Sequence, residues 1–186
     1  TLKKGIVSEK IEEELGVKEM RKTKYDLILA NHNSTIEQKW KLGPIIQTCH
    51  GIFPYLEQPS VYADCFVAIS QEVQQHLSQK GLPSFIIPNG INCEIFRPIN
   101  PVNKTLTKVL SLCQSEVANT KIKNACKELN ISFVSYQDFG KKLWDIQKEI
   151  NKVDLVIGLG RSAYDAMACG RPVIIYDERN YMGPMG

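Results

Sequence analysis

Apolar residues in the first half of the chain gather in four short runs that polar segments separate. Each run is four to six residues long and nearly continuous, without the alternation of a half-exposed strand. Such runs are typical of strands that are buried on both faces, as in a parallel sheet. We therefore expect strands at residues 25–30, 44–49, 65–69 and 84–87.

Two helices are expected around these strands. Residues 70–81 combine Ser70 as an N-cap, apolar residues at four-residue spacing and Gly81 as a C-cap, which marks both ends of a helix. Within residues 1–24, apolar residues also recur at every fourth position, and Ser8 is the expected N-cap. This charged segment predicts a helix on the surface.

The second half of the chain resumes the alternation after a proline-rich connector near residues 88–105. Strands that alternate with helices predict a parallel α/β fold. We therefore predict two Rossmann-like halves with parallel sheets, as domains 1–95 and 96–186. The expected strands of the second half are residues 108–113, 131–135, 154–158 and 172–176, and the expected helices are 117–129, 141–151 and a short one from Ser162.

Composition narrows the classes of function. The chain is 43% hydrophobic and 23% charged, with a net charge of +3, which is typical of a soluble globular protein. Lys and Glu are interspersed, so the sequence predicts no basic face for nucleic acid. No apolar stretch approaches the ~18 residues of a membrane-spanning helix.

The six cysteines show no CxxC pair and no regular spacing. Most lie in or beside apolar runs, where a free thiol behaves as a small hydrophobic group. This pattern favours a reducing, cytoplasmic protein over a disulfide scaffold or a zinc site. The cysteines in apolar surroundings are Cys49, Cys65, Cys113 and Cys169.

The segment with the clearest chemistry is a glycine-rich turn between an apolar strand and a helix start. Gly158 and Gly160 let the backbone approach a ligand, and the N–H groups of a helix N-terminus attract an anion such as a diphosphate. Arg161 would add a charged fork beside Ser162, and Asp165, one turn further, could accept hydrogen bonds from a ribose diol. The alternative is a tight turn with a solvated Arg.

Residues 165–173, Asp-Ala-Met-Ala-Cys-Gly-Arg-Pro-Val, resemble the Glu-Ala-Met-Ala-x-Gly-x-Pro-Val signature of retaining glycosyltransferases with the two-Rossmann-domain (GT-B) architecture. This family is also described as glycosyl transferases group 1, or family 4-like. Residues 63–98 are similar to its Ser … Pro-Asn-Gly-Val-Asp … Phe-x-Pro stretch. Residues 48–50, Thr-Cys-His, resemble its Thr-x-His at a strand end. The three segments occur in the family's order.

The resemblance implies a metal-independent transferase with no cofactor beyond its nucleotide-sugar donor, such as a UDP- or GDP-sugar. Residues 96–186 would bind the donor and would lack their end. Residues 1–95 would form the C-terminal part of the acceptor-side domain, for a glycan, lipid or small-molecule acceptor, with possible peripheral membrane contact. In this interpretation Asp165 holds the ribose, Gly160 meets the diphosphate and His50 serves the reaction. Both ends of the chain are expected to be cuts.

The sequence also departs from the family pattern. Ile157 stands where the family's first Glu would contact the donor sugar. The Arg expected after strand 108–113 is absent, and Lys121 is the remaining cation there. We expect Arg161 to compensate for that missing charge.

Two other functions stay open. One is a nicotinamide-dependent enzyme, because Gly158-x-Gly160-x-x-Ala163 follows a strand and Asp177 ends the next one, as in the dinucleotide fingerprint. The other is a non-catalytic, glycosyltransferase-like binding subunit, which the missing Glu and Arg favour.

Overall fold

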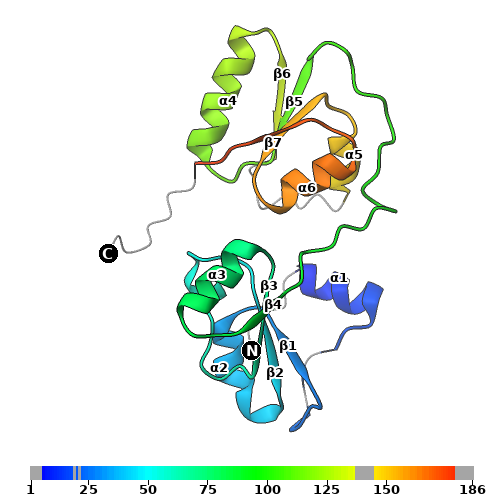
Figure 1. The fold of residues 1–186 in the computed structure, drawn as a ribbon. Helices are drawn as coiled ribbons and strands as arrows, with labels where there is room; N and C mark the ends of the chain where they lie inside the picture. The colour runs from blue at the N-terminus through cyan, green and yellow to red at the C-terminus, as the bar shows by residue number, and fades with distance from the viewer. Residues whose placement is uncertain (1–5, 19, 21, 137–144, 179–186) are drawn as a thin grey trace. The chain divides into compact units, whose positions relative to one another are not determined.

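The structure is a computed structural model that describes residues 6–18, 20, 22–136 and 145–178. The chain divides into two compact units, Thr1–Pro88 and Asn89–Gly186. Each unit has its own four-stranded parallel sheet and its own hydrophobic cores (Figure 1). This organisation confirms the predicted α/β class with parallel strands.

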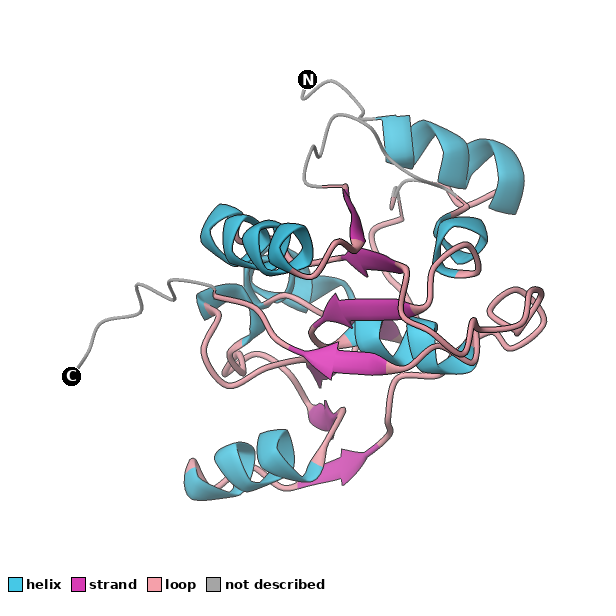
Figure 2. Cartoon of the chain, turned by 90° about the horizontal axis from the view of Figure 1, so that it is seen from above, coloured by secondary structure: helices cyan, strands magenta, loops and turns pink. Residues whose placement is uncertain are grey.

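The first unit contains a sheet with strand order β1-β2-β3-β4, all parallel. Figure 2 distinguishes the strands, in magenta, from the helices, in cyan. The elements in chain order are α1 (Ile6–Leu15), β1 (Ile28–Ala30), α2 (Asn33–Lys39), η1 (Trp40–Leu42), β2 (Ile45–Cys49), η2 (Tyr55–Glu57), β3 (Cys65–Ala68), α3 (Gln71–Gln79) and β4 (Ser84–Ile86).

Capping explains where α3 begins, but not where α1 begins. In α3 the Ser70 hydroxyl accepts a hydrogen bond from the Val73 N–H, and Gly81 follows with φ +73°, so both predicted caps are confirmed. In α1 the prediction is wrong. The helix already includes Ile6, so Ser8 lies inside it instead of capping it.

The sheet of the first unit is covered on one face by α2 and α3, contrary to the prediction that its strands are buried on both faces. Ile36 and Leu77 are fully buried on that face. On the opposite face Leu29 is 75% exposed and Phe85 is 68% exposed. The strand order explains this, because successive right-handed crossovers that move in one direction all lie on the same face of a sheet.

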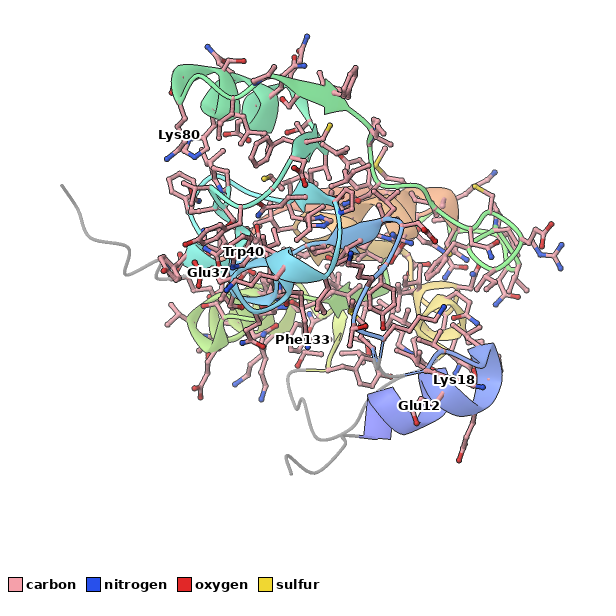
Figure 3. All side chains as sticks on the ribbon, turned by 90° about the horizontal axis from the view of Figure 1, so that it is seen from below. Glu12, Lys18, Glu37, Trp40, Lys80 and Phe133 are labelled. Carbon is pink, nitrogen blue, oxygen red and sulfur yellow. The ribbon has the colours of Figure 1, made fainter. Side chains whose placement is uncertain are left out.

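A stacked aromatic pair fixes the corner between α2 and β2. The rings of Trp40 and Tyr62 are 4.9 Å apart and nearly parallel, and Lys41 lies over the Trp40 ring. Figure 3 labels Trp40 beside Glu37 of α2. Next to this corner, Gly43 passes close to the backbone carbonyl of Tyr25. The aromatic contact therefore ties η1 to the segment that leads into β3.

The second unit contains a sheet with strand order β6-β5-β7-β8, again all parallel. Helix α4 packs on one face, and α5 and α6 pack on the other. This is the doubly wound arrangement of a Rossmann-like half. Its elements are β5 (Lys108–Ser111), α4 (Glu116–Glu128), β6 (Ser132–Ser135), α5 (Ile146–Ile150), β7 (Leu155–Gly158), α6 (Arg161–Ala168) and β8 (Val173–Ile175).

Residues 97–108, the later part of the connector and the start of β5, are bonded to the rest of the second unit by three buried polar residues. Asn151 accepts from the Ile99 N–H and donates to the Arg97 carbonyl. Arg171 donates to the carbonyls of Asn100 and Asn151. Asp154 accepts hydrogen bonds from the residues that lead into β5. The segment therefore belongs to the second unit.

The cysteines are free, and Cys49, Cys113, Cys126 and Cys169 are buried in the cores. Their predicted role as small hydrophobic residues is confirmed for Cys49, Cys113 and Cys169, whereas Cys65 is only half-buried. Among the described residues, none of the helices is long and apolar enough to cross a membrane.

Candidate functional site: the carboxyl edges of the two sheets

The strand order of the second unit contains a topological switch point between β5 and β7. The chain leaves β5 toward β6 on one side and later returns to β7 on the other side. In doubly wound folds, ligands bind at the carboxyl ends of the strands at this position. Here those ends are followed by residues 112–115 and by the glycine-rich turn at 158–160.

The glycine-rich turn has a backbone that only glycine adopts easily. Gly160 has φ +63° and ψ −128° and is the N-cap residue of α6, with no side-chain cap. A Cβ at Gly158 would lie 2.6 Å from the Ser162 hydroxyl oxygen. That hydroxyl donates to the carbonyl of Leu159 at 3.0 Å. Ser162 therefore closes the turn internally, a role that the sequence did not indicate.

Arg161 and Asp165 bind each other across one turn of α6. The Arg161 Nε donates to Asp165 Oδ1 at 2.7 Å, and the two side chains are 50% and 12% exposed. The two residues expected to hold diphosphate and ribose thus lie together, as an i,i+4 ion pair. A ligand at this turn would meet a guanidinium whose Nε is already engaged.

Lys121 lies on α4, on the other face of the sheet from Arg161. Its Nζ forms an ion pair with Glu178 at 2.6 Å, and Glu178 also accepts from the Tyr176 hydroxyl at 2.8 Å. The hydrogen bond to Glu178 raises the pKa of Lys121. The same bond, with that from Tyr176, lowers the pKa of Glu178.

Ile157 does not point to the carboxyl edge of the sheet. It is 8% exposed and packs with Val109 and Cys113 in the core beneath α4. The position that aligns with the family's first Glu therefore has a structural role here.

Asp177 lies over the same edge. Its carboxylate accepts hydrogen bonds from the backbone N–H groups of Gln114 at 3.4 Å and Ser115 at 3.3 Å, just before α4. From the sequence, Asp177 is expected only as the ribose-binding acid of a dinucleotide site. These contacts depend on a crossing of the chain over β7, for which the sequence carries no signal.

His50 follows β2 at the carboxyl edge of the other sheet. Its Nε2 lies 3.2 Å from Oδ1 of Asn31, which follows the neighbouring strand β1. Asn31 was not predicted, although its place directly after an apolar run could have indicated it. Beside it, burial and the nearby Glu57 raise the pKa of the Cys49 thiol to about 11.

The predicted site residues therefore form separate groups. One group lies at the glycine-rich turn and the start of α6, and it consists of Gly158, Gly160, Arg161, Ser162 and Asp165. Lys121 lies on the opposite face of the same sheet, and His50 belongs to the first unit. Within the described residues, no cluster of three or more His, Cys, Asp or Glu side chains could hold a metal ion.

No curated protein matches the chain. The family model Glycosyltransferase Family 4 matches residues 16–95, which include all four strands of the first sheet and His50. The match covers less than half of the chain, and over these residues the chain is similar to Glycosyltransferase Family 4.

Proposed function

We propose that this chain transfers a glycosyl unit from a nucleotide-sugar donor to an acceptor. The observation that carries the proposal is the match of residues 16–95 to Glycosyltransferase Family 4. The first unit would serve the acceptor, and the second unit would bind the donor. The resemblance of residues 165–173 to the retaining GT-B signature supports that division.

The donor diphosphate would bind at the carboxyl edge of the second sheet, between β5 and β7. The turn at Gly158–Gly160 brings the backbone close, and the first N–H groups of α6 point their positive dipole there. Arg161 is the nearest guanidinium, and Lys121 would supply a second charge from α4. These groups would stabilise the leaving diphosphate by fixed electrostatics, in place of a metal ion.

His50 would act on the acceptor side. With the Asn31 oxygen facing the ring, Nε2 carries the proton and Nδ1 is left as an acceptor. In this tautomer, Nδ1 of His50 can accept the proton of the hydroxyl group of the sugar acceptor while the hydroxyl oxygen attacks the donor sugar. Asn31 would then be a positioning residue that sets the tautomer.

The proposal is tested by thermal shift and calorimetry with UDP, GDP, the corresponding nucleosides and NAD(H). A ligand that binds the folded chain raises the midpoint of unfolding. We expect one diphosphate nucleotide to raise it, its nucleoside to do so less, and NAD(H) to have no effect. A midpoint raised by NAD(H) alone would replace the transferase with the dinucleotide-dependent enzyme.

A second function, a non-catalytic subunit that binds nucleotide sugars, is favoured by the burial of Ile157 in the core. A buried Ile supplies no carboxylate to the donor sugar. Incubation of the chain with the nucleotide sugar that binds best separates the two functions. Release of free nucleotide with an acceptor mixture supports the transferase, and tight binding without release supports the subunit.

A further inference from the structure

The chain crosses the carboxyl edge of the second sheet directly after β8. Strands β5 and β8 are not neighbours, because β7 lies between them. Nevertheless the Tyr176 N–H donates to the Gly158 carbonyl at 3.2 Å, and Cys113, after β5, donates its thiol to the Tyr176 carbonyl at 3.1 Å. Figure 1 shows this segment in red, passing from β8 across β7 toward α4.

The two residues that follow place carboxylates on the far side of the crossing. Asp177 accepts from the N–H groups of Gln114 and Ser115, next to the N-terminus of α4. Glu178 binds Lys121, and the Tyr176 hydroxyl orients it. Backbone N–H groups before a helix and a lysine are the partners that a diphosphate would use. In this structure two side-chain carboxylates of the chain itself occupy them.

We propose that residues 176–178 form a carboxylate strap that closes the donor site, and that a nucleoside diphosphate competes with it for the same N–H groups and the same lysine. The proposal rests on the proposed function, since it concerns the same edge of the sheet. Binding would move Asp177 off Gln114 and Ser115 and exchange Glu178 for a phosphate oxygen on Lys121.

A strap that competes with the ligand and an acid that binds the ligand predict opposite effects of substitution on the affinity for the ligand. If Asp177 and Glu178 compete with the ligand, their removal strengthens binding. If Asp177 instead holds a ribose, its removal weakens binding. For Glu178→Gln, an exposed ion pair predicts a dissociation constant about two- to fivefold lower. For Asp177→Ala, the loss of charged hydrogen bonds predicts a decrease on the order of tenfold.

The experiment measures binding of UDP, GDP and inorganic pyrophosphate by calorimetry to the wild-type chain and its variants. The matched control is Glu149→Gln. Glu149, on α5 across the sheet from α4, accepts from a lysine and a tyrosine hydroxyl, as Glu178 does. Its substitution should leave all three dissociation constants unchanged. Asp177→Asn keeps an acceptor oxygen without the charge and should fall between the wild type and Asp177→Ala.

Each outcome decides one of the two proposals. The strap is overturned, and the transferase is left standing, if the nucleotide binds the wild type, Glu178→Gln and Asp177→Ala with equal affinity. Weaker nucleotide binding by Asp177→Ala has the same meaning. Tighter pyrophosphate binding in the strap variants, with no nucleotide bound by any of them, shows that the strap covers a diphosphate site but overturns the nucleoside diphosphate as its ligand, and with it the transferase. Hydrogen exchange at the Gln114 and Ser115 amides gives a ligand-free check, since Asp177→Ala should speed it. Unchanged exchange contradicts the strap.

Discussion

Arg161 has two possible partners, the Asp165 carboxylate that it binds in this structure and the diphosphate that we propose. Both are anions, and the Nε bond to Asp165 leaves the terminal nitrogens of the fork to contact a phosphate. The ion pair would thus orient Arg161 for its ligand. The ion pair also explains how α6 can bury the Asp165 carboxylate, since Arg161 lies one turn earlier and carries the opposite charge.

Substitution of Arg161 tests this role directly. Arg161→Ala should weaken the binding of UDP or GDP by about 1.5–3 kcal/mol, the usual contribution of a charged hydrogen bond. It should change the affinity for the nucleoside little. Arg161→Lys should recover part of the loss, because a point charge remains without the fork. Calorimetry with each nucleotide and its nucleoside measures both effects. Equal losses for the two ligands would remove Arg161 from the phosphate site.

Gly43 provides a test of stability at a single residue. A Cβ at this position would overlap the Tyr25 carbonyl oxygen, and φ is +159°. The neighbour is backbone and cannot rotate away, so Gly43→Ala should lower the free energy of unfolding by about 1–3 kcal/mol. Gly90→Ala is the control, since nothing lies within 4 Å of its added Cβ. Denaturant unfolding of both variants compares them, and similar midpoints would refute the steric argument.

At the scale of elements, the sequence predicted helices and strands where apolar residues are dense. All eight expected strands are present, shortened by one to three residues because their outer residues enter turns. Helix α2 was missed because Ile36 is its one apolar residue. Its fold depends on burying that residue under the sheet, and periodicity cannot reveal a single contact. Of the expected helix 141–151, residues 141–144 lie outside the described part.

The candidate site divides in the same way. Local signals revealed the glycine-rich turn, because glycine spacing and a following helix are readable along the chain. The pairing of His50 with Asn31 and the Asp177 contacts arise between segments that the fold brings together. Composition and spacing carry no record of such contacts. The grouping of His50 with Asn31 and the contacts of Asp177 therefore come from the tertiary structure alone, and their functional roles remain proposals.

Asp154 links the connector to the start of β7 and predicts a dependence of stability on pH. Burial alone would raise its pKa, but hydrogen bonds from the Thr107 hydroxyl and from the Thr107, Lys108 and Asn103 N–H groups outweigh burial and lower it from 3.8 to about 2. A lowered pKa stabilises the folded state above pH ~4, and that contribution is lost as the pH falls toward 2.

The expected loss between pH 4 and pH 2 is on the order of 2 kcal/mol from this residue. Asp154→Asn removes the charge at every pH, so its stability should be lower at neutral pH and should fall less steeply over that interval. Urea unfolding at several pH values compares the variant with the wild type. Parallel curves would show that Asp154 does not carry the acid dependence.

At the scale of the whole molecule, the evidence for function differs between the two units. The family match ends at residue 95 and covers the first unit from residue 16. The proposal that the second unit is the donor domain rests on its strand order, its glycine-rich turn and the resemblance of residues 165–173. The division into two units agrees with separate cores, since each hydrophobic cluster lies within one unit.

Separate units predict separate effects of substitution. His50 lies in the first unit, so His50→Ala should leave the dissociation constant of UDP or GDP unchanged and should lower turnover by about 10²–10⁴-fold if it acts as a general base. Asn31→Ala should lower turnover less, because the ring loses only its orienting partner. Calorimetry and a nucleotide-release assay give the two readouts. Weaker nucleotide binding by His50→Ala would contradict the division of roles.

The distribution of thiols has a practical consequence. Burial raises the pKa of Cys49, Cys126 and Cys169, so little of their sulfur is thiolate, and Cys113 is enclosed in a core. Cys93 is exposed and lies just after the division between the units. A maleimide dye should therefore attach first to Cys93. The native sequence thus supplies an attachment point for a fluorescent label near the boundary between the units, without engineered cysteines.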